Sequence, residues 1–139
     1  MNKKASELMG EAVIAGATLE AKKTILKSVA FGLGGLVGEA LANVAVKPAS
    51  VPGDHEGIHY VAVGPSKVGF FSMKRGLFKS SLDELLIQHS RSDVQAMEIK
   101  SGFMPEAHFL FRDGTHYVLM CPRIHLGKLK KVRELLGTQ

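Results

Sequence analysis

The chain lacks tryptophan, and its small aromatic content limits the functions open to it. Among 139 residues there are seven Phe and two Tyr, so aromatic residues make up 6% of the sequence. Proteins that hold single-stranded nucleic acid stack its bases on exposed aromatic side chains along a basic groove. A basic helical stripe with base-reading residues is also missing. We therefore expect no nucleic acid among the partners.

Cysteine is almost absent, since Cys121 is the single example and a disulfide within the chain is excluded. Lys3 and Lys4 stand near the N-terminus, but Glu7 and Glu11 follow before any apolar run develops, which does not fit a secretory signal. The expected location is the reducing cytoplasm, with association at a membrane left open by the apolar segment described below.

Motifs for catalysis or metal binding are missing too. No serine or cysteine stands in a strand-to-helix elbow between glycines, and no pair of acids suggests acid–base chemistry. His55 and His59 are four residues apart, but a strand is expected to begin between them. Cys121 and His125 flank Pro122 without a nearby carboxylate, so neither pair supplies three or four converging ligands. We predict a protein that is not an enzyme, with no catalytic residues, no metal site and no cofactor.

The composition and the pattern of apolar residues change at a proline-rich segment. Residues 5–46 have no proline and are rich in Ala, Leu, Gly and Val, whereas residues 47–54 include Pro48, Pro52 and Gly53, which cannot continue a helix. Short runs of alternating polarity follow, divided by turn residues at intervals typical of an all-β unit. The sequence thus predicts a helical segment over 1–46, a linker over 47–55, and a β unit with a final helix over 56–137.

The N-terminal segment carries two stripes that favour packing against another helix. Apolar residues recur at alternating four- and three-residue steps, at Leu8, Ala12, Ala15, Leu19, Leu26 and Val29. Small residues recur every four positions and would let two helix backbones approach closely, at Ala30, Gly34, Gly38 and Ala42. The glycines here are no phosphate loop, because Glu39 and Ala40 follow them instead of the Lys-Ser or Lys-Thr pair that such a loop needs.

Between Lys27 and Lys47 the only charged residue is Glu39. This apolar stretch is slightly shorter than the ~20 residues of a helix that spans a bilayer, and Glu39 would be costly near the centre of a span. Three interpretations stay open: close helix packing within the protein or a homo-oligomer, shallow membrane association over 28–46, and a membrane span.

Seven strands are expected in the β unit, at 58–63, 68–73, 77–82, 85–89, 94–100, 107–112 and 115–120. Asp113 and Gly114 suit a type I′ turn, which would place Phe111 opposite His116 and Phe109 opposite Val118. One face of this hairpin would then be core, formed by Ala107, Phe109, Phe111, Val118 and Met120. A helix is expected from Ile124 to Leu136, with one apolar stripe formed by Leu126, Leu129, Val132 and Leu136.

This order of strands and helix resembles the bacterial branch of the pleckstrin-homology-like superfamily (PH-like or GRAM-like domains). The likeness covers about 56–137 and is carried by residues 61–71 (VAVGPSKVGFF), 82–86 (LDELL), 91–94 (RSDV) and 109–117 (FLFRDGTHY). The resemblance implies an α+β fold, namely a partly open antiparallel β-barrel of about seven strands. A C-terminal helix would cap the barrel, and the N-terminal helical segment would precede it.

In pleckstrin-homology domains a basic set around the first strands can hold a lipid headgroup, which makes Lys67, Lys74, Arg75 and Lys79 candidates here. This chain departs from the lipid-binding pattern of the family, because Gly76 and Leu77 stand where a second Arg is expected. A net charge of +5 also favours anionic partners without identifying them.

Two functions are expected from these observations. The first is a non-catalytic interaction module that self-associates or binds a protein, with Ala30, Gly34, Gly38 and Ala42 as a helix–helix interface. The second is a peripheral membrane protein that inserts the apolar 28–46 segment and contacts anionic lipid through its basic loops.

Overall fold

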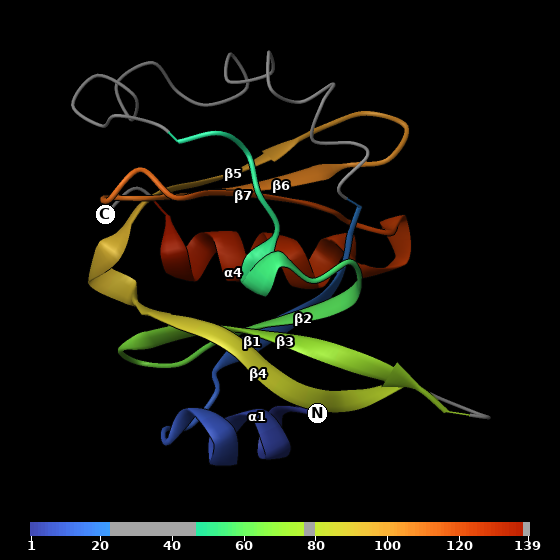
Figure 1. Cartoon of the computed structure of the whole chain (residues 1–139), viewed down its shortest axis with the longest axis vertical. Coiled ribbons are helices and arrows are strands. Elements are labelled where there is room, and N and C mark those ends of the chain that lie inside the picture. The colour runs from blue at the N-terminus through green and yellow to red at the C-terminus, as the bar shows by residue number, and fades with distance from the viewer. Residues whose placement is uncertain (23–46, 77–79, 138–139) are drawn as a thin grey trace.

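A computed structural model describes residues 1–22, 47–76 and 80–137 (Figure 1). Within these ranges the α-helices are α1 (Asn2–Met9) and α4 (Leu126–Leu136). The strands are β1 (Ala15–Ala21), β2 (Gly57–Val63), β3 (Lys67–Arg75), β4 (Ser80–Ser90), β5 (Val94–Lys100), β6 (Glu106–Phe111) and β7 (His116–Met120). Short 3₁₀ turns are η2 (Pro52–Asp54), η3 (Arg91–Asp93) and η4 (Arg123–His125).

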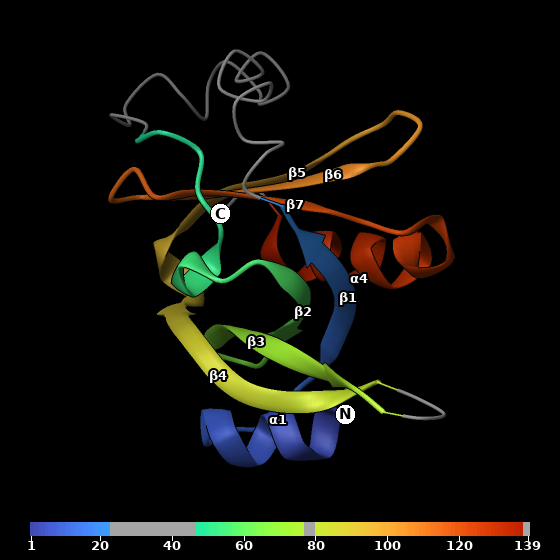
Figure 2. The ribbon, with the colours of Figure 1, turned by 45° about the vertical axis from the view of Figure 1, so that its right-hand side comes forward.

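The strands form one seven-stranded sheet in the order β4-β3-β2-β1-β7-β6-β5, with antiparallel pairing between neighbouring strands. Two meanders, β1–β4 and β5–β7, join where β1 pairs with β7 at Glu20 and Met120. The sheet bends at this seam, so the two meanders face each other with α4 between them (Figures 1 and 2). The predicted α+β class, with a largely antiparallel β unit and a C-terminal helix, is confirmed.

The core lies between the two meanders, where α4 buries the apolar stripe expected from the sequence. Leu129, Val132 and Leu136 are fully buried in the main hydrophobic cluster, and Leu126 packs against it. Phe109 and Phe111, predicted as core, are buried in the same cluster. Burying the three enclosed α4 side chains contributes on the order of 4–9 kcal/mol of transfer free energy, at roughly 1.5–3 kcal/mol each.

Helix α1 covers the outer face of the β2–β4 part of the sheet (Figure 2). Its buried residues Ala5 and Met9 pack with Tyr60, Phe71 and Leu82 in a second hydrophobic cluster. The expected helical character is therefore confirmed for Asn2–Met9.

The prediction of a helix is wrong for Ala15–Ala21, which forms β1 in the middle of the sheet. Ala15 and Leu19 were assigned to a helical seam because they are four residues apart. Four is an even number, so the same spacing also places both side chains on one face of a strand. That face is buried along the whole of β1, and the sheet therefore begins well before the proline-rich segment.

The predicted linker also contributes to the fold. The Ser50 amide donates to the His116 carbonyl oxygen at 2.9 Å, and the Val118 amide donates to the Ser50 carbonyl oxygen at 3.1 Å. The next residue, Val51, is buried in the main core. Residues 50 and 51 thus lie against β7 instead of forming a free connector.

Residues 77–82 and 85–89 were predicted as two strands, whereas the structure has the single strand β4 from Ser80. Its pairing with β3 is irregular around Phe71, which is typical of a β-bulge. At this irregularity the Glu84 amide donates to Ser72 Oγ at 3.3 Å. A bulge interrupts the alternation of side chains along a strand, so Asp83 and Glu84 lie within β4 although the sequence pattern divides this strand in two.

The register of the β6–β7 hairpin differs by one residue from the prediction. Phe109 pairs with Tyr117, and not with Val118. The Phe111 amide donates to the Thr115 carbonyl oxygen at 2.9 Å, so the loop contains three residues and Gly114 alone of them has a positive φ, of 93°. A three-residue loop of this kind combines a type I turn with a glycine bulge.

As a result of this register, Tyr117 and Leu119 join Phe109 and Phe111 in the main core. The predicted members Val118 and Met120 belong to the other face of β7, because neighbouring residues of a strand alternate between its faces.

Candidate functional site

The predicted headgroup residues do not come together. Lys67 begins β3 and its Nζ donates to the Met9 carbonyl oxygen at 3.0 Å. Lys74 is near the other end of β3, about 23 Å away along an extended strand at roughly 3.3 Å per residue. Arg75 is exposed beside Lys74, and Lys79 lies outside the described residues. One headgroup cannot touch both ends of β3, so these residues do not form a single phosphate site.

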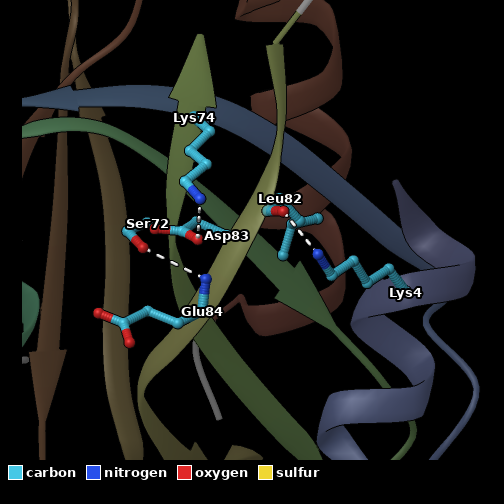
Figure 3. Close-up of polar contacts among 6 residues, drawn as sticks. All are labelled: Lys4, Ser72, Lys74, Leu82, Asp83 and Glu84. Carbon is cyan, nitrogen blue, oxygen red and sulfur yellow. Dashed lines mark hydrogen bonds and ion pairs between the residues drawn. The ribbon is translucent and has the colours of Figure 1, made fainter. Parts of the chain in front are cut away.

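Figure 3 shows that Lys74 already has a partner, because its Nζ lies 3.7 Å from Asp83 Oδ1 on β4. In the same region Lys4 Nζ donates to the Leu82 carbonyl oxygen at 2.8 Å and ties α1 to β4. These lysines make contacts that hold the β3–β4 hairpin and α1 together.

The predicted helix–helix interface of Ala30, Gly34, Gly38 and Ala42 lies outside the described residues, as does the apolar 28–46 segment. Within residues 1–22, 47–76 and 80–137, no helix is long and apolar enough to cross a bilayer.

Two large apolar side chains stand out by their exposure to solvent. Phe103 is 95% exposed in the loop of residues 101–105 between β5 and β6, and Ile124 is 86% exposed in η4. Other exposed apolar side chains, such as Leu8 at 43% and Ile14 at 46%, are partly covered. Leaving such a side chain in water forgoes roughly 1.5–3 kcal/mol of burial free energy, and neither Phe103 nor Ile124 contributes to the core.

The loops that carry these two side chains are joined by hydrogen bonds. Arg123 Nε donates to the Phe103 carbonyl oxygen at 3.2 Å, and Arg123 Nη2 donates to the Gly102 carbonyl oxygen at 2.6 Å. The Cys121 amide donates to the Pro105 carbonyl oxygen at 2.8 Å. We call residues 101–105 together with η4 the loop tip; it lies at one end of the molecule (Figure 1, right-hand side).

Positive charge is concentrated next to the loop tip. Residues 121–137 hold one acid, Glu134, and five basic residues: Arg123, Lys128, Lys130, Lys131 and Arg133. None of these five forms one of the ion pairs seen among the described residues. Most of the net charge of +5 therefore belongs to this short segment.

A cavity of about 200 Å³ lies between the loop tip and α4. Three basic side chains line it, namely Arg123, Lys130 and Arg133. Its apolar lining comes from Ile99, Pro105 and Leu126, and Ser101 and Gly102 complete it. Leu126, Lys130 and Arg133 follow at four- and three-residue steps, which places them on one face of α4.

A separate polar group is buried on β6 and β7. His108 Nδ1 lies 3.0 Å from His116 Nε2, and His108 Nε2 lies 3.2 Å from Glu106 Oε1. A carboxylate only accepts, so the neutral His108 donates from Nε2 to Glu106 and accepts at Nδ1 from His116 Nε2. This leaves His116 Nδ1 as a buried acceptor without a hydrogen-bond partner.

Burial and, to a smaller extent, the nearby His108 together lower the pKa of His116 to about 4. Burial also lowers the pKa of His108, although the hydrogen bond to Glu106 opposes this shift. Among the residues that the structure describes, no group of three or more His, Cys, Asp or Glu side chains is arranged so that it could hold a metal ion. The buried thiol of Cys121 has its pKa raised to about 11 by burial, so it stays protonated near neutral pH and is a poor nucleophile.

No protein-family model, curated protein or solved structure matches this chain.

Sequence reasoning missed the loop tip, and a signal for it was present. Phe103 stands beside Gly102 and near Pro105, and Ile124 follows Pro122. An apolar residue among turn-forming residues has no strand or helix face to carry it into a core, and it is buried only where its loop packs against a strand, as Val51 does beside β7. Two such positions beside a basic helix indicate a surface that binds another molecule or a membrane.

Proposed function

We propose that this protein is a peripheral membrane-binding module that docks the loop tip onto an anionic bilayer surface. The observation that carries the proposal concerns Phe103 and Ile124, which have the two most exposed large apolar side chains in the part of the chain that the structure describes and lie on loops joined through Arg123. The adjoining segment also carries five of the basic residues and one acid.

The energetics favour an anionic bilayer as the partner. Insertion of an apolar side chain contributes up to roughly 1.5–3 kcal/mol, and each basic residue near an anionic lipid surface adds about 1 kcal/mol. Neither term alone gives stable binding, and peripheral proteins combine the two. Apolar side chains on narrow loops suit a deformable lipid surface better than a flat protein face.

Self-association through the loop tip is disfavoured by its charge. A two-fold dimer brings the same patch of both copies together, so the basic residues around Arg123 would face one another. The helix–helix interface expected from residues 30–42 stays a prediction. Its test is the size of the full chain by light scattering, since deletion of residues 1–46 would remove the central strand β1.

We further propose that the chain is a PH-like domain. Support comes from the two antiparallel meanders with α4 between them, and from the motif at 109–117, which forms the last hairpin. This proposal concerns the fold family, and the membrane proposal does not depend on the basic set that the family resemblance implied.

The membrane proposal is tested by co-sedimentation with vesicles of phosphatidylcholine containing about 30% phosphatidylglycerol at low ionic strength. The parent protein is expected to bind, and the double variant F103S/I124S to bind at least tenfold more weakly, since about 1.4 kcal/mol corresponds to tenfold. The matched control L8S/I14S removes two exposed apolar side chains elsewhere and is expected to bind like the parent.

Added salt and vesicles of phosphatidylcholine alone should both weaken binding, because screening and loss of lipid charge remove the electrostatic part. No binding of the parent to anionic vesicles would refute the proposal. Equal losses in F103S/I124S and L8S/I14S would refute the assignment to the loop tip.

A further inference from the structure

We infer that the cavity between the loop tip and α4 is a phosphate-binding site, in which Arg123, Lys130 and Arg133 hold the phosphate group of an anionic phospholipid. The assignment of a lipid as its source rests on the proposed membrane function. The shared chemistry is a phosphate ester, and a free phosphate ester offers the same oxygens.

Charge is the first argument. Two guanidinium groups and one ammonium group line the same cavity of about 200 Å³, and no acidic residue is among its lining. Three cations around one space repel each other unless an anion enters. Arginine forks match phosphate oxygens in pairs of hydrogen bonds, and charge-assisted bonds of this kind are the strong ones.

Preorganisation is the second argument. The carbonyl oxygens of Gly102 and Phe103 accept hydrogen bonds from Arg123, which uses Nε and Nη2 for them. A guanidinium has five N–H donors, so donors remain for a ligand after the side chain has been fixed in place. The same two hydrogen bonds hold the loop that presents Phe103, so the site and the inserting side chain share one support.

The rest of the lining is the third argument. Ile99, Pro105 and Leu126 make part of the cavity apolar. Low polarity around the cations strengthens their attraction for an anion, because the local dielectric constant is lower than in water. An apolar lining beside the cations also fits the glycerol and first acyl carbons that follow the phosphate of a lipid.

The experiment compares R133Q with K131Q, two variants that each remove one positive charge from α4. Arg133 lines this cavity, whereas Lys131 is not part of its lining. Arg133 contributes no side-chain hydrogen bond among the contacts described, so R133Q is expected to keep the fold, and thermal unfolding checks this. The second variant, R133K, keeps the positive charge but loses the paired N–H donors of the guanidinium group.

The soluble arm is an NMR titration of the full chain with glycerol 3-phosphate. Glycerol 3-phosphate is expected to shift the amide resonances of residues 101–105 in the parent and in K131Q. Its affinity for R133K should be at least fivefold lower, and in R133Q these resonances should hardly shift. The vesicle arm is expected to show that R133Q loses more affinity for phosphatidylglycerol vesicles than K131Q does.

A larger loss for R133Q on vesicles without any shift by glycerol 3-phosphate would support the site and assign it to lipid alone. Shifts by glycerol 3-phosphate without any vesicle binding would support the phosphate site and refute the membrane function. Equal losses for R133Q and K131Q on vesicles, with no shift by glycerol 3-phosphate, would overturn the site and leave the membrane function standing.

Discussion

Replacing Gly16 with alanine is expected to destabilise the protein by about 1–3 kcal/mol, the range found when a tightly packed site is overfilled. A Cβ atom at Gly16 would lie 2.5 Å from Cζ and 2.6 Å from Cε2 of Tyr60. Tyr60 is buried, and its hydroxyl donates to Asn2 Oδ1, so the ring cannot move away without losing contacts of β2 and α1. Urea unfolding of both proteins measures the difference.

The sign of this effect separates the two structures considered for residues 15–21. In a helix, the change from glycine to alanine stabilises by about 1 kcal/mol. In β1 it produces a collision across the strand pair. A G16A protein as stable as the parent would therefore contradict the position of β1 beside β2.

Gly127 provides the matched control. It lies in α4 with nothing within 4 Å of the position that a Cβ atom would take. G127A is expected to be neutral or to stabilise by up to about 1 kcal/mol, as for an exposed helical site. Shortening the opposing ring in Y60L should recover part of the loss in the double variant G16A/Y60L, because neighbouring residues couple.

The parts of the fold that the sequence predicts correctly are long and periodic. The helix of Leu126–Leu136 shows its apolar stripe every three or four residues, and β6 has apolar residues at every second position, at Ala107, Phe109 and Phe111. The part that failed, β1, is built mainly from Ala, Gly and Leu, which fit a close-packed strand and a helix equally well. Only its pairing with β2 and β7, which is a long-range property, decides between them.

The difference between local pattern and long-range contact also explains why the site was not predicted from the sequence. Lys67 and Lys74 are near each other in sequence but stand at opposite ends of β3. Conversely, Phe103 and Arg123 are twenty residues apart and are brought together by hydrogen bonds between two loops. Loop residues carry no periodic signal, so their proximity follows from strand register and cannot be seen in the chain alone.

Acidification is expected to weaken the fold through the buried histidines of β6 and β7. The pKa of His116 is about 4 in the folded chain, below its ordinary value of about 6.5. The unfolded chain therefore binds a proton more readily than the folded chain at any pH between these values. Stability is complete above about pH 6.5 and falls as the pH decreases toward 4.

For His116 alone, linkage gives a loss of about 2 kcal/mol in the free energy of unfolding between about pH 7 and about pH 5. His108 and His59, whose pKa values burial also lowers, change stability in the same direction. The pKa values of Glu11 and Asp113 are lowered by hydrogen bonds from Ser66 and Thr115 respectively. Both carboxylates thus stay ionised in the folded chain over this interval, and the loss belongs mainly to histidine.

The measurement is urea unfolding at both pH values for the parent, H116Q and H125Q. A glutamine at 116 can donate to His108 Nδ1 but does not titrate, so the loss on acidification should shrink by about 1–2 kcal/mol. H125Q removes a histidine of η4 outside the buried group and should keep the parent's response.

The same loss in H116Q as in the parent would show that His116 is not the residue that couples folding to protons. A parent whose stability does not change over this interval would contradict the buried, neutral state of His108 and His116.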